Sequence, residues 1–255
     1  MKLVLFYPDP PEQLEGHTLS KTIEYFDIIG YNFTENIDDD WTIGVHWDLQ
    51  DVNETPQALL EDKRPVLNRY LNNITKSHVD KIFAEVFGYS SFADTTQHGF
   101  CVRKSERQSA HDGVIVKTPC EREPGYVYQK LIDNRMGIDM VYDIRISMFM
   151  GHIPPLYIKG KSMEGLFENA LSKTLKYWMS PLEEYLTDDA IMNVILFSAK
   201  IGLDLGEIDL LRDNSTGKLY IIDVNNIPGG SVFNYIEKGE EVKNQLAWIF
   251  NSVLP

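Results

Sequence analysis

Apolar residues along the 255-residue chain fall into strand-like runs and helix-like spacings. Leu3–Tyr7 and Trp41–Trp47 are short apolar runs that predict strands. Between them, His17–Ile29 carries apolar residues at helical spacing and is followed by Gly30, a typical helix terminator. The order strand, helix, strand predicts a small open α/β sheet over residues 1 to about 70.

The middle of the chain changes from helical to strand-like patterns. Residues 66–74 and 77–87 have helical periodicity, and the second segment ends at Gly88. Because the polar segment 105–112 separates β-rich stretches, we expect two helices and then strands. The β-rich stretches are 99–104, 113–117 and 126–132.

Strands and helices are both predicted in the carboxyl-terminal half. Val141–Met150 predicts a strand whose partner, Leu156–Lys159, follows a turn at 151–155. Thr187 is placed to cap a helix over 187–201, and Gly202 is placed to stop it. Two further helices are predicted, over about 164–180 and over 237–253.

A predicted hairpin near the carboxyl terminus carries unusual polar residues. Two apolar runs, 208–211 and 219–224, flank the turn sequence 213–217. Alternation along a strand puts Asp223 and Asn225 on one face, and the turn folds Asp209 back opposite Asp223. Facing carboxylates repel each other, so a cation resolves the arrangement, and oxygen ligands suit Mg²⁺ carrying nucleotide phosphates. The alternative is an acidic hairpin whose polar face lies in water.

The composition of the chain excludes some classes of binding partner. The formal net charge is −14, from 38 acidic and 24 basic residues, which argues against nucleic acid or an anionic membrane as the main partner. No apolar stretch approaches the roughly 18 residues that span a bilayer. Cys101 and Cys120 are the only cysteines, so reduced thiols are expected. We expect a soluble, cytoplasmic protein with no nucleic-acid or membrane partner.

The hairpin resembles the carboxyl-terminal metal-binding element of the ATP-grasp superfamily, which has Asp on one strand, Glu-x-Asn on the next and then Pro-Gly. Here the matching residues are Asp209, then Asp223 and Asn225, then Pro228-Gly229. Asp replaces the usual Glu at 223, which shortens the reach but keeps the charge. The resemblance identifies Asp209, Asp223 and Asn225 as metal ligands.

The resemblance also implies an architecture. We expect an α/β (α+β) ATP-grasp fold in which a small amino-terminal α/β domain, 1–70, precedes two α+β subdomains that clamp the nucleotide. The first of these, 71–133, is the nucleotide-lid subdomain. The second, 134–255, contains the metal-binding hairpin.

Lysines upstream of the hairpin match the family's phosphate-binding lysines in order and spacing. Lys76 opens a predicted helix, and Lys104 precedes the polar loop 105–113, so both are expected to hold the ATP phosphates. Such loops are normally glycine-rich, whereas Gly113 is the only glycine here. Ser109 and His111 are the loop's candidate phosphate donors. Lys117 competes with Lys104, which we prefer because the loop must follow the lysine.

Further segments resemble the adenine hinge and the substrate side of the site. Tyr126–Asp133 resembles the hinge, which implies that its last residues border the purine and ribose. Asp143-Ile-Arg145 matches the family's Asp-x-Arg strand, so Arg145 is expected to face the γ-phosphate or an acyl phosphate. Lys159 and Lys161 are expected to face substrate and phosphate. The expected hinge contacts are Gln129, Lys130, Leu131 and Ile132, with Asp133 or Asn134 at the ribose hydroxyls.

The resemblance implies an ATP-dependent ligase. Arg145 and Lys104 are the expected catalytic residues, acting with ATP and one or two Mg²⁺ ions, for which Mn²⁺ can substitute. A small-molecule or peptide carboxylate becomes an acyl phosphate, an amine attacks it, and ADP and phosphate are released. Two alternatives stay open: a small-molecule kinase on the same scaffold, and an inactive nucleotide-binding module, which the glycine-poor loop and short amino-terminal domain favour.

Overall fold

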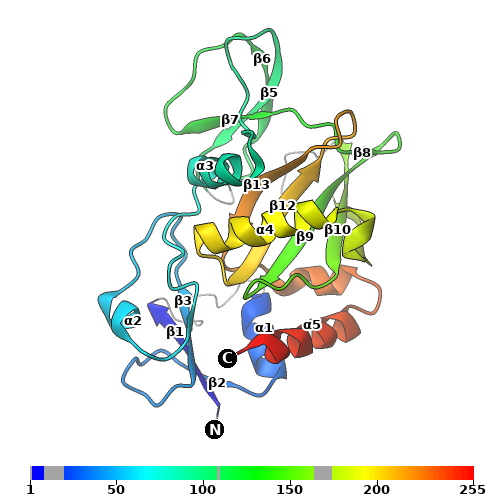
Figure 1. Ribbon diagram of the computed structural model, residues 1–255. Helices are drawn as coiled ribbons and strands as arrows, with labels where there is room; N and C mark the ends of the chain where they lie inside the picture. The colour runs from blue at the N-terminus through cyan, green and yellow to red at the C-terminus, as the bar shows by residue number, and fades with distance from the viewer. Residues whose placement is uncertain (1, 9–19, 108–109, 164–173) are drawn as a thin grey trace.

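The computed structural model describes residues 2–8, 20–107, 110–163 and 174–255, and within these ranges the chain forms three β-sheets (Figure 1). The amino-terminal sheet, within residues 3–67, lies at one end of the molecule, and a small sheet, within 99–130, lies at the other. The central sheet, within 135–225, lies between them (Figure 1). The α/β (α+β) class expected from the sequence is confirmed.

The amino-terminal sheet is parallel, in the order β2-β1-β3-β4. Its apolar strands are buried as the runs predicted, and the predicted helix ends before Gly30 as expected. The elements are β1 (Leu3–Pro8), α1 (Lys21–Ile28), β2 (Asn32–Thr34), β3 (Ile43–Trp47), α2 (Gln57–Glu61) and β4 (Val66–Leu67).

The helix predicted over 66–74 is wrong. Val66 and Leu67 pair with Gly44 and Val45 of β3, which buries both side chains. Asn68 then adopts a φ of 57°, a left-handed conformation that a right-handed helix cannot continue. Strand pairing in the sheet therefore overrides the local helical spacing.

The small sheet is antiparallel and follows a helix, as predicted. Helix α3 (Lys76–Phe87) is capped by the Thr75 hydroxyl and ends at Gly88 with a φ of 78°. The sheet order is β6-β5-β7. The strands are β5 (Gly99–Ser105), β6 (Val114–Thr118) and β7 (Tyr126–Lys130).

The central sheet is antiparallel, in the order β11-β10-β9-β12-β13, with the short β8 (Arg135–Met136) pairing with β9. Helices α4 (Asp188–Ile201) and α5 (Gly239–Val253) confirm the predicted helices, and Thr187 and Gly202 bound α4 as expected. The strands are β9 (Met140–Phe149), β10 (Leu156–Ser162), β11 (Thr174–Ser180), β12 (Leu205–Arg212) and β13 (Leu219–Asn225).

The helix predicted over 164–180 is wrong in its described part. Residues 174–180 form β11, which pairs antiparallel with β10, and residues 164–173 lie outside the described residues. Aromatic Tyr177 and Trp178 suit a pleated surface, and the edge of β10 supplies the backbone partners that a helix would otherwise provide internally.

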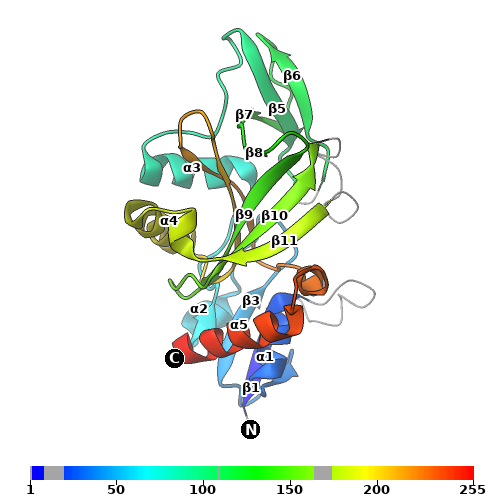
Figure 2. The ribbon, with the colours of Figure 1, turned by 90° about the vertical axis from the view of Figure 1, so that its right-hand side faces the viewer.

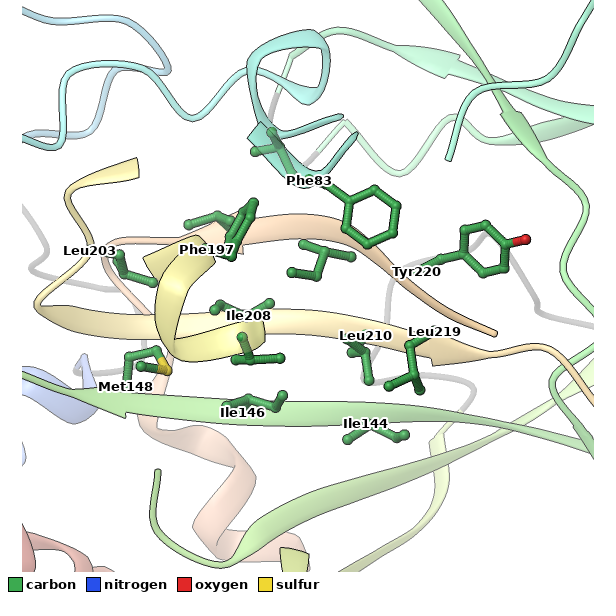
Figure 3. Close-up of a cluster of buried hydrophobic side chains, with 14 of the residues drawn as sticks. Phe83, Ile144, Ile146, Met148, Phe197, Leu203, Ile208, Leu210, Leu219 and Tyr220 are labelled. Atoms are coloured by element: carbon green, nitrogen blue, oxygen red, sulfur yellow. The ribbon is translucent and has the colours of Figure 1, made fainter. Parts of the chain in front are cut away.

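The two faces of the central sheet differ in character. On one face, apolar side chains of β9, β12 and β13 pack against Phe83 of α3 and Phe197 of α4 (Figure 3). Figure 2 shows α3 and α4 together on this side of the sheet. Residues that alternate with these, including Arg145 and Asp209, therefore project from the opposite face.

A second core joins the amino-terminal segments to the central sheet. Phe26 of α1 lies 5.1 Å from Phe250 of α5, and Phe250 lies 5.4 Å from Phe149 of β9, measured between ring centroids. This apolar contact packs α1 against α5, which in turn packs against β9 of the central sheet. In the described part of the chain no helix is long and apolar enough to cross a membrane.

Candidate active site

A cavity of about 230 Å³ lies between the small sheet and the polar face of the central sheet. Strands β5, β7, β9, β10, β12 and β13, together with the start of α3, contribute its walls. The expected site residues that line it are Lys76, Lys104, His111, Gln129, Lys130, Leu131, Ile132, Arg145, Lys159, Lys161, Asp209, Asp223 and Asn225.

The hairpin carries its polar residues in the predicted register. Asp209 of β12 pairs directly with Asp223 of β13, and Glu207 pairs with Asn225. A shift in register follows Asp209, so Leu210 pairs with Ile221 and returns to the apolar core. The two carboxylates and the amide therefore meet at the wall of the cavity.

Arg145 is the immediate partner of Asp209. The two residues pair across β9 and β12, and Nη1 of Arg145 lies 2.6 Å from Oδ1 of Asp209. Burial raises the pKa of Asp209 to about 6 against the pull of Arg145, and Asp223 adds to the rise. Burial opposes the charge of Arg145, but Asp209, Glu207 and Asp143 more than compensate and raise its pKa.

Strand β10 adds two lysines opposite β9, of which Lys159 is buried and Lys161 is partly buried. Lys161 forms an ion pair with Asp143, and Lys159 has an exposed fraction of only 2%. Burial, with further repulsion from Arg145 and Lys161, lowers the pKa of Lys159 to about 7. A phosphate anion would relieve the crowding of these three cations.

Lys104 and Lys117 occupy different environments. Lys104 lines the cavity, where burial lowers its pKa and Asp223 partly offsets the shift. Lys117 pairs with Phe100 at the open edge of the small sheet and is exposed; it is not among the described residues that line the cavity.

The loop after β5 is docked on α3. Nζ of Lys76 donates a 2.6 Å hydrogen bond to the carbonyl of Arg107. The carboxylate of Glu106 accepts hydrogen bonds from the amide of Ser77 at 2.8 Å and from its hydroxyl at 3.0 Å, at the helix amino terminus. His111 lines the cavity with a φ of 50°, whereas the expected donor Ser109 lies outside the described residues.

The hinge segment lines the cavity with four consecutive residues, Gln129, Lys130, Leu131 and Ile132. Lys130 lines the cavity, but its Nζ donates to the carbonyl of Ser90 at 2.6 Å. Among the described residues Asp133 does not line the cavity, because its carboxylate accepts two 2.7 Å hydrogen bonds from Arg135. Asn134, the other ribose candidate, does line it.

Other residues of the cavity were not expected as site residues. Asp143 shares a face with Arg145, so the two-residue alternation in β9 was the available signal for it. Arg107 and Asp112 belong to the loop whose conformation the sequence does not specify. The additional polar lining residues are Arg107, Asp112 and Asp143.

The ligand set fits a divalent cation that shares its coordination with another molecule. In the described ranges no group of three or more His, Cys, Asp or Glu side chains is placed to hold a metal ion. Asp209, Asp223 and Asn225 supply two carboxylates and one amide, all hard oxygen donors. Phosphate oxygens would complete such a coordination shell.

The overall fold of the chain is similar to that of several solved structures. PsnB, an ATP-grasp ligase complexed with a minimal precursor, matches with a TM-score of 0.60, 11% sequence identity and coverage of 99% of this chain and 98% of that chain. The chain has the ATP-grasp fold. The resemblance seen in the sequence is thereby confirmed for the fold.

Two other ATP-grasp ligases extend the comparison. A Chryseobacterium gregarium RiPP-associated ligase, complexed with ADP and a leader and core peptide, has a TM-score of 0.56 and 13% identity over 100% of this chain and 98% of that chain. The D-alanine–D-alanine ligase of Bacillus anthracis, complexed with ATP, has a TM-score of 0.53 and 13% identity over 98% of both chains. No family model and no curated protein matched the sequence.

Proposed function

We propose that the cavity binds Mg·ATP and that the chain is an ATP-dependent ligase that joins a carboxylate to an amine. The observation that carries the proposal is the meeting, in one cavity, of several lysines and Arg145 with two carboxylates and an amide. These groups come from the start of α3, from the small sheet and from four strands of the central sheet.

The charges within the cavity suit a polyphosphate. Among the described residues, seven Lys or Arg and four Asp line it, although the whole chain has a net charge of −14. We assign the apolar Val102, Leu131 and Ile132 to the adenine end and Asn134 to the ribose. Lys76, Lys104 and Lys161 then belong to the phosphate end.

The proposed reaction uses the charged face of the central sheet. A substrate carboxylate attacks the γ-phosphorus, ADP leaves, and an amine then displaces phosphate from the acyl phosphate. Bound Mg²⁺ supplies charge neutralisation at the phosphates. Arg145 and Lys104 stabilise the negative charge that spreads over the transferred phosphoryl oxygens, and Asp209 holds Arg145 in place through the 2.6 Å ion pair.

We assign the carboxylate substrate to the class of small molecules or peptides. Support comes from the structural neighbours, which are complexed with a minimal precursor or with a leader and core peptide, or are named D-alanine–D-alanine ligase. The alternative is a small-molecule kinase, which would release a stable phosphorylated product instead of an amide and free phosphate.

Calorimetry tests nucleotide and metal binding directly. A non-hydrolysable ATP analogue is titrated with and without Mg²⁺ into the wild type, Asp223→Asn and Asp213→Asn. Asp223→Asn should weaken Mg²⁺-dependent binding at least about tenfold, because a charged ligand is lost. Asp213 accepts turn hydrogen bonds from the amides of Ser215 and Thr216, each at 2.9 Å, so its variant should bind within about twofold of the wild type.

The reaction class is tested by following ADP release with carboxylates screened against an amine panel. A ligase requires both substrates and yields an amide and free phosphate. Absence of nucleotide binding at millimolar concentration, or equal losses in the two aspartate variants, would contradict the proposed function.

A further inference from the structure

A buried ion pair joins α1 to the hairpin beside the cavity. Lys21, the first residue of α1, pairs with Glu207 of β12, and both residues are almost completely buried. The ammonium lies 4.8 Å from the ring centroid of Tyr157 and 5.8 Å from that of Phe233. Removing one partner of such a pair leaves an uncompensated buried charge.

The position of Glu207 makes this pair relevant to the candidate metal ligands. Glu207 lies two residues before Asp209 on the same face of β12 and directly opposite Asn225. Its charge acts on both Asp209 and Arg145. Nevertheless, Glu207 is not among the described residues that line the cavity. A third carboxylate therefore borders the ligand set without joining it.

The backbone fixes the direction in which Lys21 reaches. Its amide donates a 2.9 Å hydrogen bond to the carbonyl of Pro228, and Ser20 forms a bridge with Gly229. The first turn of α1 is thus attached to the segment that follows Asn225. Lys21 consequently holds the Glu207 carboxylate toward α1.

We propose that Lys21 withholds the Glu207 carboxylate from the cation site and so makes divalent-cation binding depend on the nucleotide. Asp209, Asp223 and Asn225 alone leave most of a coordination shell to phosphate oxygens and water. Adding Glu207 would give three carboxylates and an amide, a set that binds a cation without phosphate. The inference rests on the cation site of the proposed function.

The test measures Mn²⁺ binding in the absence of nucleotide, using the electron paramagnetic resonance signal of the free ion. Lys21→Met frees Glu207 and should tighten Mn²⁺ binding at least about fivefold. The double variant Lys21→Met/Glu207→Gln should return to within about twofold of the wild type, since the added carboxylate is gone. Lost packing alone would weaken binding, so a gain in affinity separates this role from structural damage.

Lys243→Met is the matched control, because Lys243 lies 3.8 Å from Glu24 of α1 and, within the described residues, does not line the cavity. It should leave Mn²⁺ binding unchanged. Lys21→Gln is measured in parallel, since it removes the same charge but keeps a hydrogen-bond donor for Glu207 if the methionine variant fails to fold.

Unchanged or weaker Mn²⁺ binding in the folded Lys21 variants would overturn the inference. A wild type that binds Mg²⁺ and nucleotide together while these variants show no gain contradicts this inference alone. A wild type without Mg²⁺-dependent nucleotide binding contradicts the proposed function and this inference with it.

Discussion

Lys104 and Lys117 lie on the same face of the small sheet, yet only Lys104 reaches the cavity. Paired residues on adjacent strands share a face, and Phe100, which precedes Lys104 by four residues, pairs with Lys117. The two lysines therefore differ in their position along the sheet rather than in orientation. Under the proposed function, only Lys104 is placed to contact a phosphate of the nucleotide.

Lys104→Met is expected to raise the nucleotide KM and lower kcat together, reducing kcat/KM at least about tenfold, because the lost charge acts on both ground and transition states. Lys117→Met should stay within about threefold of the wild type. Steady-state kinetics at several ionic strengths measures both variants. If Lys117→Met is the damaging change, the assignment of the 105–113 loop to the phosphates is wrong.

At the scale of elements, two helices end at glycines with the same backbone conformation but different surroundings. Gly88 ends α3 with a φ of 78° and Gly202 ends α4 with a φ of 87°. A Cβ at Gly88 would meet nothing within 4 Å, whereas a Cβ at Gly202 would lie 2.6 Å from the carbonyl of Tyr70. Both ends were predicted from local sequence, but the close approach was not.

Gly88→Ala should lower the free energy of unfolding by about 1 kcal/mol, the cost of a left-handed conformation for a residue with a Cβ. Gly202→Ala should lower it by about 3 kcal/mol or more, since the backbone near Tyr70 must also move. Urea unfolding of both variants measures the difference. Equal losses would show that the contact with Tyr70 relaxes without cost.

At the scale of the whole molecule, the cavity lies between two sheets that the chain forms far apart in sequence. The small sheet spans 99–130, while the hairpin strands β12 and β13 span 205–225. The amino-terminal sheet does not line the cavity among the described residues. A nucleotide in the cavity would therefore join the small sheet to the central sheet.

Hydrogen exchange at short labelling times tests this arrangement. An ATP analogue with Mg²⁺ should slow amide exchange in β5 and β12 and leave β1 unchanged, because local opening of the two sheets is restricted where they share a ligand. The same analogue without Mg²⁺ should have a smaller effect on β12, which carries Asp209. Slowing spread evenly over all three sheets would contradict a site between these two.

The sequence by itself determined the hairpin with Asp209 opposite Asp223, the ends of α3 and α4, and the order of the motifs that resemble ATP-grasp enzymes. These features depend on turn chemistry, capping and alternation, which act between residues close in sequence. Local sequence alone therefore predicts them.

The tertiary structure decided the rest. Residues 174–180 became a strand because β10 supplied a partner, and Asn134 lines a cavity that forms only where the two sheets meet. Lys21 and Glu207 are 186 residues apart in sequence. Such a pairing depends on which surfaces meet during folding, and no local spacing encodes that.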